Sequence, residues 1–476
     1  MRPATLRRFA PAVLATIALA AATWVIFSRA FLNYDTLYAL IWGRDLAHGH
    51  LPDFEFTLAP TPHPLAIAVG ALASLFGTDG GYTVMLAIAL LSFGALLWGV
   101  FRLGQSAFAW PVGLLAGLVV ATRVPFLSQG TRAYVDIPFL ALIVFAAVLE
   151  IQRPRRGWYV LVLLALAGLV RPEAWLLAAA YWVYLAPELD RRKRLGTLAL
   201  VAAPPLLWAL GDLIVTGDPL HSLTGTRDTA ETLNRPRGLG DVPETMARRL
   251  GEILRLPVLV GGTAGFFAAL YLTRMRAKVP AALALLGGLA FVALGVADLP
   301  LIGRYLLLPA AMLSIFFGFA ALGWLDFAPE RQRRRWMIGA AVLLAVFLAF
   351  VPANVSGLSN MRDGIQLRGK IEDDLRSLTR DPAAKPLLKS CAPVYVPNHR
   401  PVPILAWYLD EDQEAFTSAL LERPRRGLYV APATSGVEEK FVLDPNDPAR
   451  LRAEVPRGFT RVTGNQSWVL YARGCF

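Results

Sequence analysis

The feature that most constrains this sequence is a series of long apolar runs separated by short charged clusters. A helix needs about 20 apolar residues to cross a bilayer, and irregular backbone is not tolerated against lipid. The runs therefore predict an all-α polytopic membrane domain with about eleven transmembrane helices over residues 1–352. The expected spans are 9–27, 81–102, 106–123, 134–151, 157–170, 172–187, 196–215, 256–273, 279–297, 303–324 and 335–352.

The charge balance agrees with a membrane protein. Only 17% of the residues are charged, whereas ordinary globular domains carry about one quarter. The formal net charge is +12, but the arginines stand in the connections between the apolar runs. Cytoplasmic loops retain Lys and Arg, so a basic balance follows from membrane topology. We therefore expect membrane lipids around the chain and no nucleic-acid partner.

Four basic clusters set the expected orientation. If the apolar run at 62–77 does not cross the membrane, all four clusters lie on the same side as the N-terminus. The positive-inside rule prefers this arrangement, so 62–77 is predicted to be a re-entrant or interfacial helix. The chain is then a multi-pass protein of the plasma membrane with a cytoplasmic N-terminus. The clusters are Arg153/Arg155/Arg156, Arg191/Arg192/Lys193/Arg194, Arg274/Arg276/Lys278 and Arg331/Arg333/Arg334/Arg335.

The segment 353–476 is far less apolar and contains turn signals and short strand-like stretches. It is predicted to be a small α/β or α+β domain on the extracytoplasmic side. Both cysteines of the chain, Cys391 and Cys475, lie in it. In an oxidising compartment they could form a disulfide, and two unpaired thiols are the alternative.

The first outer loop, 29–80, carries the strongest functional signal. Its first part has helical spacing of apolar residues and a neighbouring polar stripe formed by Asp35, Tyr38, Trp42 and Asp45. This pattern predicts a short amphipathic helix over 35–48 that lies on the membrane surface. Three of the five histidines follow in the same loop, namely His48, His50 and His63. A plainer alternative is that Asp35 only caps a helix and the histidines are solvated.

At this loop the chain resembles the GT-C superfamily, the polytopic glycosyltransferases that use polyprenyl-phosphate sugars, such as protein mannosyltransferases and lipid A aminoarabinose transferases. Members carry a catalytic Asp or Glu directly after the first helix, and Asp35 in Tyr34-Asp35-Thr36 stands at that position. The resemblance implies that Asp35 is the general base, which deprotonates the acceptor hydroxyl.

Further motifs in the first 350 residues carry the same resemblance, and all fall on the predicted outer side. We assign Arg304, Tyr305 and Arg171 from these motifs to the donor phosphate, together with Arg132, which lies just before the first of them. Guanidinium groups match phosphate geometry. Helix capping and snorkelling toward headgroups are the alternatives for these charged residues. Asp136, Tyr38, Trp42, His63 and Glu173 are assigned to substrate binding. The motifs are Tyr134–Pro138, Gly168–Trp175, Gly217–Leu220 and Gly303–Pro309.

Metal use stays open at this stage. Thr36 follows Asp35, so the adjacent acidic pair that accompanies metal dependence in this superfamily is missing. Asp35, Asp136 and His63 could still converge on one divalent cation.

The resemblance thus implies transfer of a sugar from a polyprenyl-phosphate donor to an extracytoplasmic glycan, lipid or protein acceptor, with inversion. The main alternative is a lipid or sugar transporter or flippase. Transporters often show internal duplication and charged groups at the bilayer midplane. Here no duplication is evident, and the polar groups cluster at the predicted outer ends of the helices.

Overall fold

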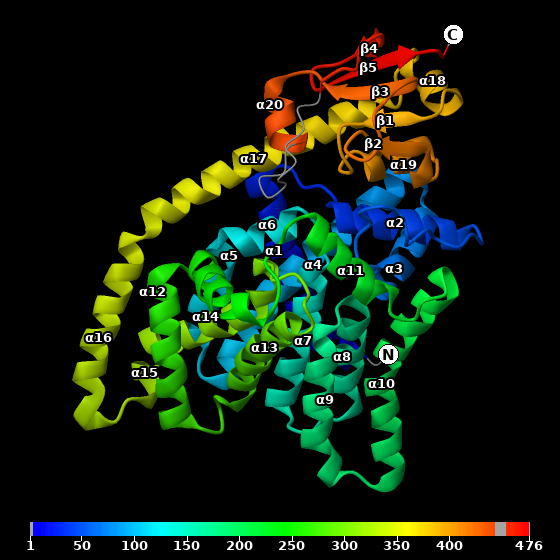
Figure 1. Cartoon of the computed structure of the whole chain (residues 1–476). Coiled ribbons are helices and arrows are strands. Elements are labelled where there is room, and N and C mark those ends of the chain that lie inside the picture. Colours follow the sequence, from blue (N-terminus) through cyan, green and yellow to red (C-terminus); the bar gives the residue numbers. More distant parts are fainter. Residues whose placement is uncertain (1–2, 443–453, 476) are drawn as a thin grey trace.

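The computed structural model describes residues 3–442 and 454–475 of the chain. A bundle of long helices forms most of the molecule, and a small C-terminal sheet sits at one end of it (Figure 1). We call the end of the helices that faces this sheet the domain-side end. The two parts correspond to the predicted membrane domain and the predicted C-terminal domain.

Within the described residues, seven helices are long and apolar enough to cross a membrane. An eighth span is possible if the bent pair α5 (Trp110–Thr122) and α6 (Val124–Thr131), which meet at 66°, crosses as one. The seven contain α1 (Pro3–Phe27), α4 (Gly77–Ala107), α10 (Arg191–Thr216), α12 (Val242–Thr273), α13 (Lys278–Val296), α14 (Leu307–Leu322), and α16 (Glu330–Ala349) joined to α17 (Val351–Leu378).

Three further expected spans coincide with helices that are shorter than those seven. They are α7 (Asp136–Gln152), α8 (Trp158–Val170) and α9 (Glu173–Leu185), with 17, 13 and 13 residues. Because a helix rises only about 1.5 Å per residue, helices of 13 residues do not reach across the apolar core of a bilayer by length alone. A membrane-spanning helical fold is confirmed, and the count of eleven stays a prediction.

Two shorter helices fill the first loop, as expected. Asn33 caps α2 (Tyr34–Ala47) by accepting a hydrogen bond from the Thr36 amide, and α3 (Pro64–Ser74) follows. The two helices touch at glycines, since a Cβ on Gly43 would lie 2.3 Å from the Ala71 amide nitrogen.

Helix α2 is more buried than its amphipathic pattern suggests, because nine consecutive residues, Thr36 to Arg44, are buried. One side packs on α3 and another on α19 (Val402–Leu409) of the C-terminal domain. The position of α2 at the membrane surface stays a prediction.

The C-terminal domain is a five-stranded mixed sheet of order β2-β1-β3-β5-β4. Strand β1 (Val394–Val396) runs parallel to β2 (Phe416–Ser418) and β3 (Gly427–Pro432), whereas β5 (Trp468–Arg473) pairs antiparallel with β3 and β4 (Thr460–Gly464). A disulfide joins Cys391 to Cys475 and so ties the segment before β1 to the end of β5. The smaller elements are α15 (Trp324–Phe327), α18 (Ala384–Ser390), α20 (Ser435–Val437) and short helical turns.

Specific contacts fix this domain to the first loop. Arg44 on α2 pairs with Asp410 at 3.0 Å and also donates to the Ala406 carbonyl. The Trp407 indole N–H donates to the Thr78 carbonyl at 3.0 Å. Arg44 is largely buried, and its loss would remove the positive charge that pairs with Asp410 across the interface. The domain therefore forms a fixed wall over the first loop.

The basic connections lie where the charge pattern predicted. Figure 1 shows that the α9–α10 turn and the α15–α16 turn lie at the end of the helices opposite the sheet. These turns carry the clusters Arg191–Arg194 and Arg331–Arg335. Which end faces the cytoplasm stays a prediction from the positive-inside rule.

Candidate active site

The predicted site residues come from the starts of separate helices at the domain-side end. Asp35 lies in the first turn of α2, and Asp136 is the first residue of α7. Arg171 lies between α8 and α9, and Arg304 lies in a helical turn, Gly303–Leu306, that leads into α14. Helix starts suit carboxylates because the backbone N–H groups there are unpaired and positively polarised.

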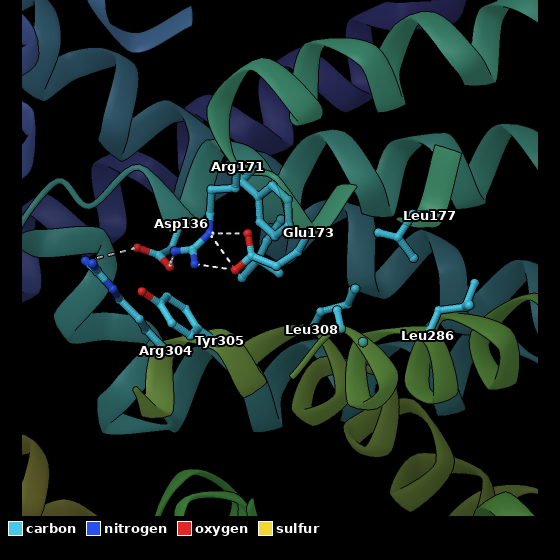
Figure 2. Close-up of a pocket in the computed structure, with 12 residues that line it drawn as sticks. Asp136, Arg171, Glu173, Leu177, Leu286, Arg304, Tyr305 and Leu308 are labelled. Carbon is cyan, nitrogen blue, oxygen red and sulfur yellow. Dashed lines mark hydrogen bonds and ion pairs between the residues drawn. The ribbon is translucent and has the colours of Figure 1, made fainter. Parts of the chain in front are cut away.

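These side chains form one connected ion network. Arg304 donates to Asp35 at 2.8 Å, and the same nitrogen lies 3.7 Å from Asp136. Arg171 pairs with Asp136 on one side and with Glu173 on the other. Figure 2 shows the part of the network that runs from Arg304 through Asp136 to Arg171 and Glu173. Asp35 and Arg304 are 269 residues apart in the chain.

The ring of Tyr305 lies close to both guanidinium groups of the network. Its ring centre lies 4.3 Å from the Arg171 guanidinium carbon and 5.7 Å from that of Arg304. The side chains are well shielded, since Asp136 is 2% exposed and Arg171 6%. Removing one partner of a buried ion pair typically costs about 3–5 kcal/mol, because it leaves an uncompensated charge. The network therefore fixes the geometry of these helix starts.

An apolar cavity of about 600 Å³ opens on one side of the network. Most of its wall is aliphatic or aromatic and comes from α9, α10, α11 (His221–Thr232) and α13. Asp212 of α10 holds α11 against it by accepting hydrogen bonds from the Ser222 amide and hydroxyl, at 2.8 Å each. Polar side chains in this wall include His63, Arg171 and Glu173.

A second cavity, of about 660 Å³, opens on the other side and is more polar. Its wall is built by α2, α6, α12 and α17 together with the C-terminal domain. Most of the charged side chains in its wall are cations. The side chains that line both cavities are Tyr34, Asp35, Arg235, Arg304 and His399.

The electrostatics of Asp35 follow from this position. Burial would raise the pKa of its carboxyl, but the adjacent Arg304 guanidinium, together with His63 and Arg235, holds the pKa below its usual value. One oxygen of Asp35 accepts from Arg304, and no described residue donates a hydrogen bond to Oδ1. Asp35 is therefore an ionised carboxylate with one oxygen open to a ligand.

His63 lies in the wall of the apolar cavity, near Asp35. Burial lowers the pKa of its imidazole to about 4, although the charge of Asp35 opposes the shift. Its Nδ1 is buried and has no hydrogen-bond partner among the described residues. His63 is therefore a neutral ring at neutral pH.

Three predicted site residues lie elsewhere. Tyr38 and Trp42 are 0% and 1% exposed, and they pack with Phe54 and Ile67 in a core cluster that borders neither cavity. Arg132 lies in the wall of the polar cavity only, between the rings of Phe31 and Tyr134, and forms no ion pair with the network. Arg132 thus shares the polar cavity and the Tyr134 ring with Arg304, but it does not line the apolar cavity, where Arg171 lies.

Two residues of the site were missed by sequence reasoning. Arg235 stands between the expected spans 196–215 and 256–273 without a recognisable motif, and its charge reaches Asp35. His399 comes from the C-terminal domain and packs edge-on against Tyr34, with ring centres 5.2 Å apart. Only the docking of distant segments brings either one to the site.

The described residues contain no group of three His, Cys, Asp or Glu side chains that could hold a metal ion. Asp35 and Asp136 do converge, as the sequence suggested. The cation between them is the guanidinium of Arg304.

The long apolar helices define the class of the protein, which is a polytopic membrane protein. No family model matches the sequence, and no curated protein matches it. Among solved structures the chain is similar to ArnT from Cupriavidus metallidurans bound to undecaprenyl phosphate, with 14% identity, a TM-score of 0.54 and 97% of each chain covered. This likeness over nearly the whole length confirms the predicted fold.

A second similar structure is the oligosaccharyltransferase AglB from Archaeoglobus fulgidus in complex with an inhibitory peptide and a dolichol-phosphate. The identity is 12% and the TM-score 0.49, over 83% of this chain and 64% of AglB. The chain therefore spans just under two thirds of that protein.

Proposed function

We propose that this protein is a membrane glycosyltransferase that moves a sugar from a polyprenyl-phosphate donor to an extracytoplasmic acceptor. The observation that carries the proposal is the place of Asp35 and Arg304, where an apolar and a polar cavity meet. Such an enzyme must join a lipid-linked donor to an aqueous acceptor at one carboxylate. The similarity to ArnT, whose structure contains undecaprenyl phosphate, supports a lipid-phosphate donor.

The apolar cavity suits the donor lipid. Its wall beside α10 contains Pro205 and Trp208, and the neighbouring Leu206, Leu207 and Leu210 are exposed on the outside of this helix. Exposed apolar side chains on a membrane helix face lipid, so a long polyprenyl tail passes from the cavity into the bilayer without meeting charge. The phosphate end of the lipid then lies near Arg304.

The ion network by itself attracts no phosphate, because Asp35, Asp136 and Glu173 outnumber its two guanidinium groups. The donor phosphate therefore needs a further cation. Arg235 lines both cavities and has no ion-pair partner among the described residues. We assign the phosphate to Arg235 and Arg304, which act as charged donors to the leaving group.

The chemistry is a single displacement. Oδ1 of Asp35 takes the proton of the acceptor hydroxyl, whose oxygen attacks the anomeric carbon. The bond between this carbon and the phosphate oxygen breaks, and its electrons remain on the phosphate, beside Arg235 and Arg304. Attack opposite the leaving group inverts the configuration. With a cytoplasmic N-terminus and eleven spans, the reaction takes place on the extracytoplasmic face of the plasma membrane.

The test uses full-length protein in lipid nanodiscs with a panel of polyprenyl-phosphate sugars and cell-envelope extract as acceptor. Free polyprenyl phosphate is quantified for the wild type, Asp35→Asn, and the control Asp45→Asn on the same helix. General-base removal typically costs about 10²–10⁴-fold, so we expect release by the wild type and the control only. Equal release by Asp35→Asn would remove Asp35 from the chemistry. No release with any donor would reject the glycosyltransferase.

A further inference from the structure

The polar cavity carries an excess of positive charge. Among the described residues, seven cationic side chains line it, against two carboxylates, Asp35 and Glu372. The cations are Arg132, Arg235, Arg249, Arg304, Arg368, Arg400 and Lys440. Low-dielectric walls concentrate the electric field of these charges, so the ligand in the cavity has to carry a complementary charge.

Several of these cations are already compensated by carboxylates. Arg304 pairs with Asp35 at 2.8 Å, and Arg368 pairs with Glu372 at 2.9 Å. Arg249 pairs with Glu252 at 2.7 Å. Lys440 pairs with Glu439 at 3.1 Å. By contrast, Arg132 and Arg235 have no carboxylate within ion-pair distance among the described residues. Arg132 and Arg235 therefore offer charge to a ligand, although Arg132 also interacts at longer range with Glu372.

Arg132 and Arg235 serve different parts of the cavity. Arg235 also lines the apolar cavity and is engaged there by the donor phosphate, whereas Arg132 lines the polar cavity alone. Arg132 is half-buried and held between two aromatic rings, at 6.0 Å from Phe31 and 5.2 Å from Tyr134. A cation positioned in this way has little freedom left to lose on binding an anion.

The other wall of the cavity belongs to the C-terminal domain. Arg400 follows β1, and its guanidinium donates to the Phe441 carbonyl at 2.9 Å. Helix α17 runs from the bundle to the sheet and contributes Arg368 (Figure 1). Because the domain is fixed on α2 by Arg44 and Trp407, these cations keep their place relative to Arg132 and Asp35.

We infer that the polar cavity binds an acceptor that carries an anionic group, a phosphate or a carboxylate, next to the hydroxyl that is glycosylated. Arg132 holds the anionic group while the hydroxyl lies at Asp35. This inference rests on the proposed glycosyl transfer and adds the chemical class of the acceptor. A neutral glycan leaves the charge of Arg132 uncompensated and is a poor acceptor.

The first test separates cell-envelope extract by anion exchange and supplies each fraction to the wild type with labelled donor. Label is expected in the retained, anionic fraction. Partition of the product between organic solvent and water then distinguishes an anionic lipid from an anionic soluble glycan. Transfer to the unretained fraction would overturn the inference and leave the glycosyltransferase in place.

The second test is kinetic. Arg132→Gln should raise the acceptor KM about tenfold or more, because it removes a charge-assisted hydrogen bond, and should leave the donor KM unchanged. Arg132→Lys should recover part of the loss. The matched control is Arg362→Gln, an exposed arginine of α17 that lines neither cavity. An unchanged acceptor KM in Arg132→Gln would contradict the inference.

A binding test needs no turnover. N-acetylglucosamine 1-phosphate and N-acetylglucosamine serve as probes, and protection of Arg132 from phenylglyoxal is read by mass spectrometry. Protection by the phosphate alone supports the anionic site. Equal protection by both probes, or none, counts against it. Protection without any sugar transfer would reject the proposed function while keeping the anion site, so the two failures are distinguishable.

Discussion

The two cavities share a wall and differ in how their charges are balanced. In the apolar cavity Arg171 is paired with Asp136 and Glu173, and His63 is neutral. In the polar cavity Arg132 has no carboxylate partner among the described residues. Arginines in the two cavities therefore have different roles. Arg171, paired with two carboxylates, supports the fold, whereas Arg132 is available to a ligand.

The largest effect that would test this comparison is on stability. Arg171→Ala leaves Asp136 and Glu173 without their cation, so the free energy of unfolding should fall by about 3–5 kcal/mol. Arg132→Ala leaves no carboxylate unpaired and should cost less than about 1 kcal/mol. Thermal unfolding in detergent measures both variants. Similar losses of stability in the two variants would show that Arg171 and Arg132 do not differ in this way.

A second effect concerns pH and His63. The imidazole has its pKa lowered from 6.5 to about 4, so the unfolded state binds the proton first. Stability contributed by the neutral ring is present above pH 6.5 and is lost as the pH falls toward 4, by on the order of 3 kcal/mol. The measurement is the unfolding temperature of the wild type and His63→Gln between pH 7 and 4. The variant should lose less stability over this range, and parallel curves would contradict the assignment.

Filling each cavity separately should separate donor from acceptor. Ala293→Trp narrows the apolar cavity and should raise the donor KM about tenfold, equivalent to about 1.4 kcal/mol. Gly364→Trp narrows the polar cavity, where a Cβ meets open space, and should do the same to the acceptor KM. Initial-rate kinetics with each substrate varied in turn measure both. If either variant affected both substrates equally, the cavities would not be separate binding sites.

The smallest expected effect is on the pH dependence of activity and concerns Asp35 and Arg304, which line both cavities. Arg304 holds the pKa of Asp35 below its usual value against burial. Without this cation, as in Arg304→Gln, burial raises the pKa, so the carboxylate is protonated at higher pH. The acidic limb of kcat/KM should therefore move to higher pH in the variant, while the wild type keeps its activity to lower pH. A limb at the same pH in both would show that Asp35 and Arg304 do not interact in the working enzyme.

Much of the fold was predictable because its signals are local. Hydropathy located the long helices, and the positions of α2 and α3 in the first loop were expected. The burial of α2 was not, because its amphipathic pattern does not reveal that α19 covers it. Spans such as α8 and α9 read as apolar runs in the sequence, but their helices end after 13 residues each.

The candidate site divides in the same way. Asp35, Asp136, Arg171 and Arg304 were chosen from short motifs, and the structure joins them in one network. Tyr38 and Trp42 share a stripe of α2 with Asp35, but they lie one and two turns further along the helix, where this stripe packs into the core. Arg235 has no motif to mark it, so only the path of its loop over the cavities brings it near Asp35.

The sequence by itself determined that this chain lies in a membrane, since long apolar runs have no other stable surroundings. It also determined which charged residues stand at helix starts, because capping and apolar periodicity act over a few neighbouring positions. Only the tertiary structure decided which charges meet. Arg304 finds Asp35 across 269 residues, and the C-terminal domain closes the polar cavity. Ion pairs act through space, so partners this distant in sequence are set by packing and not by pattern.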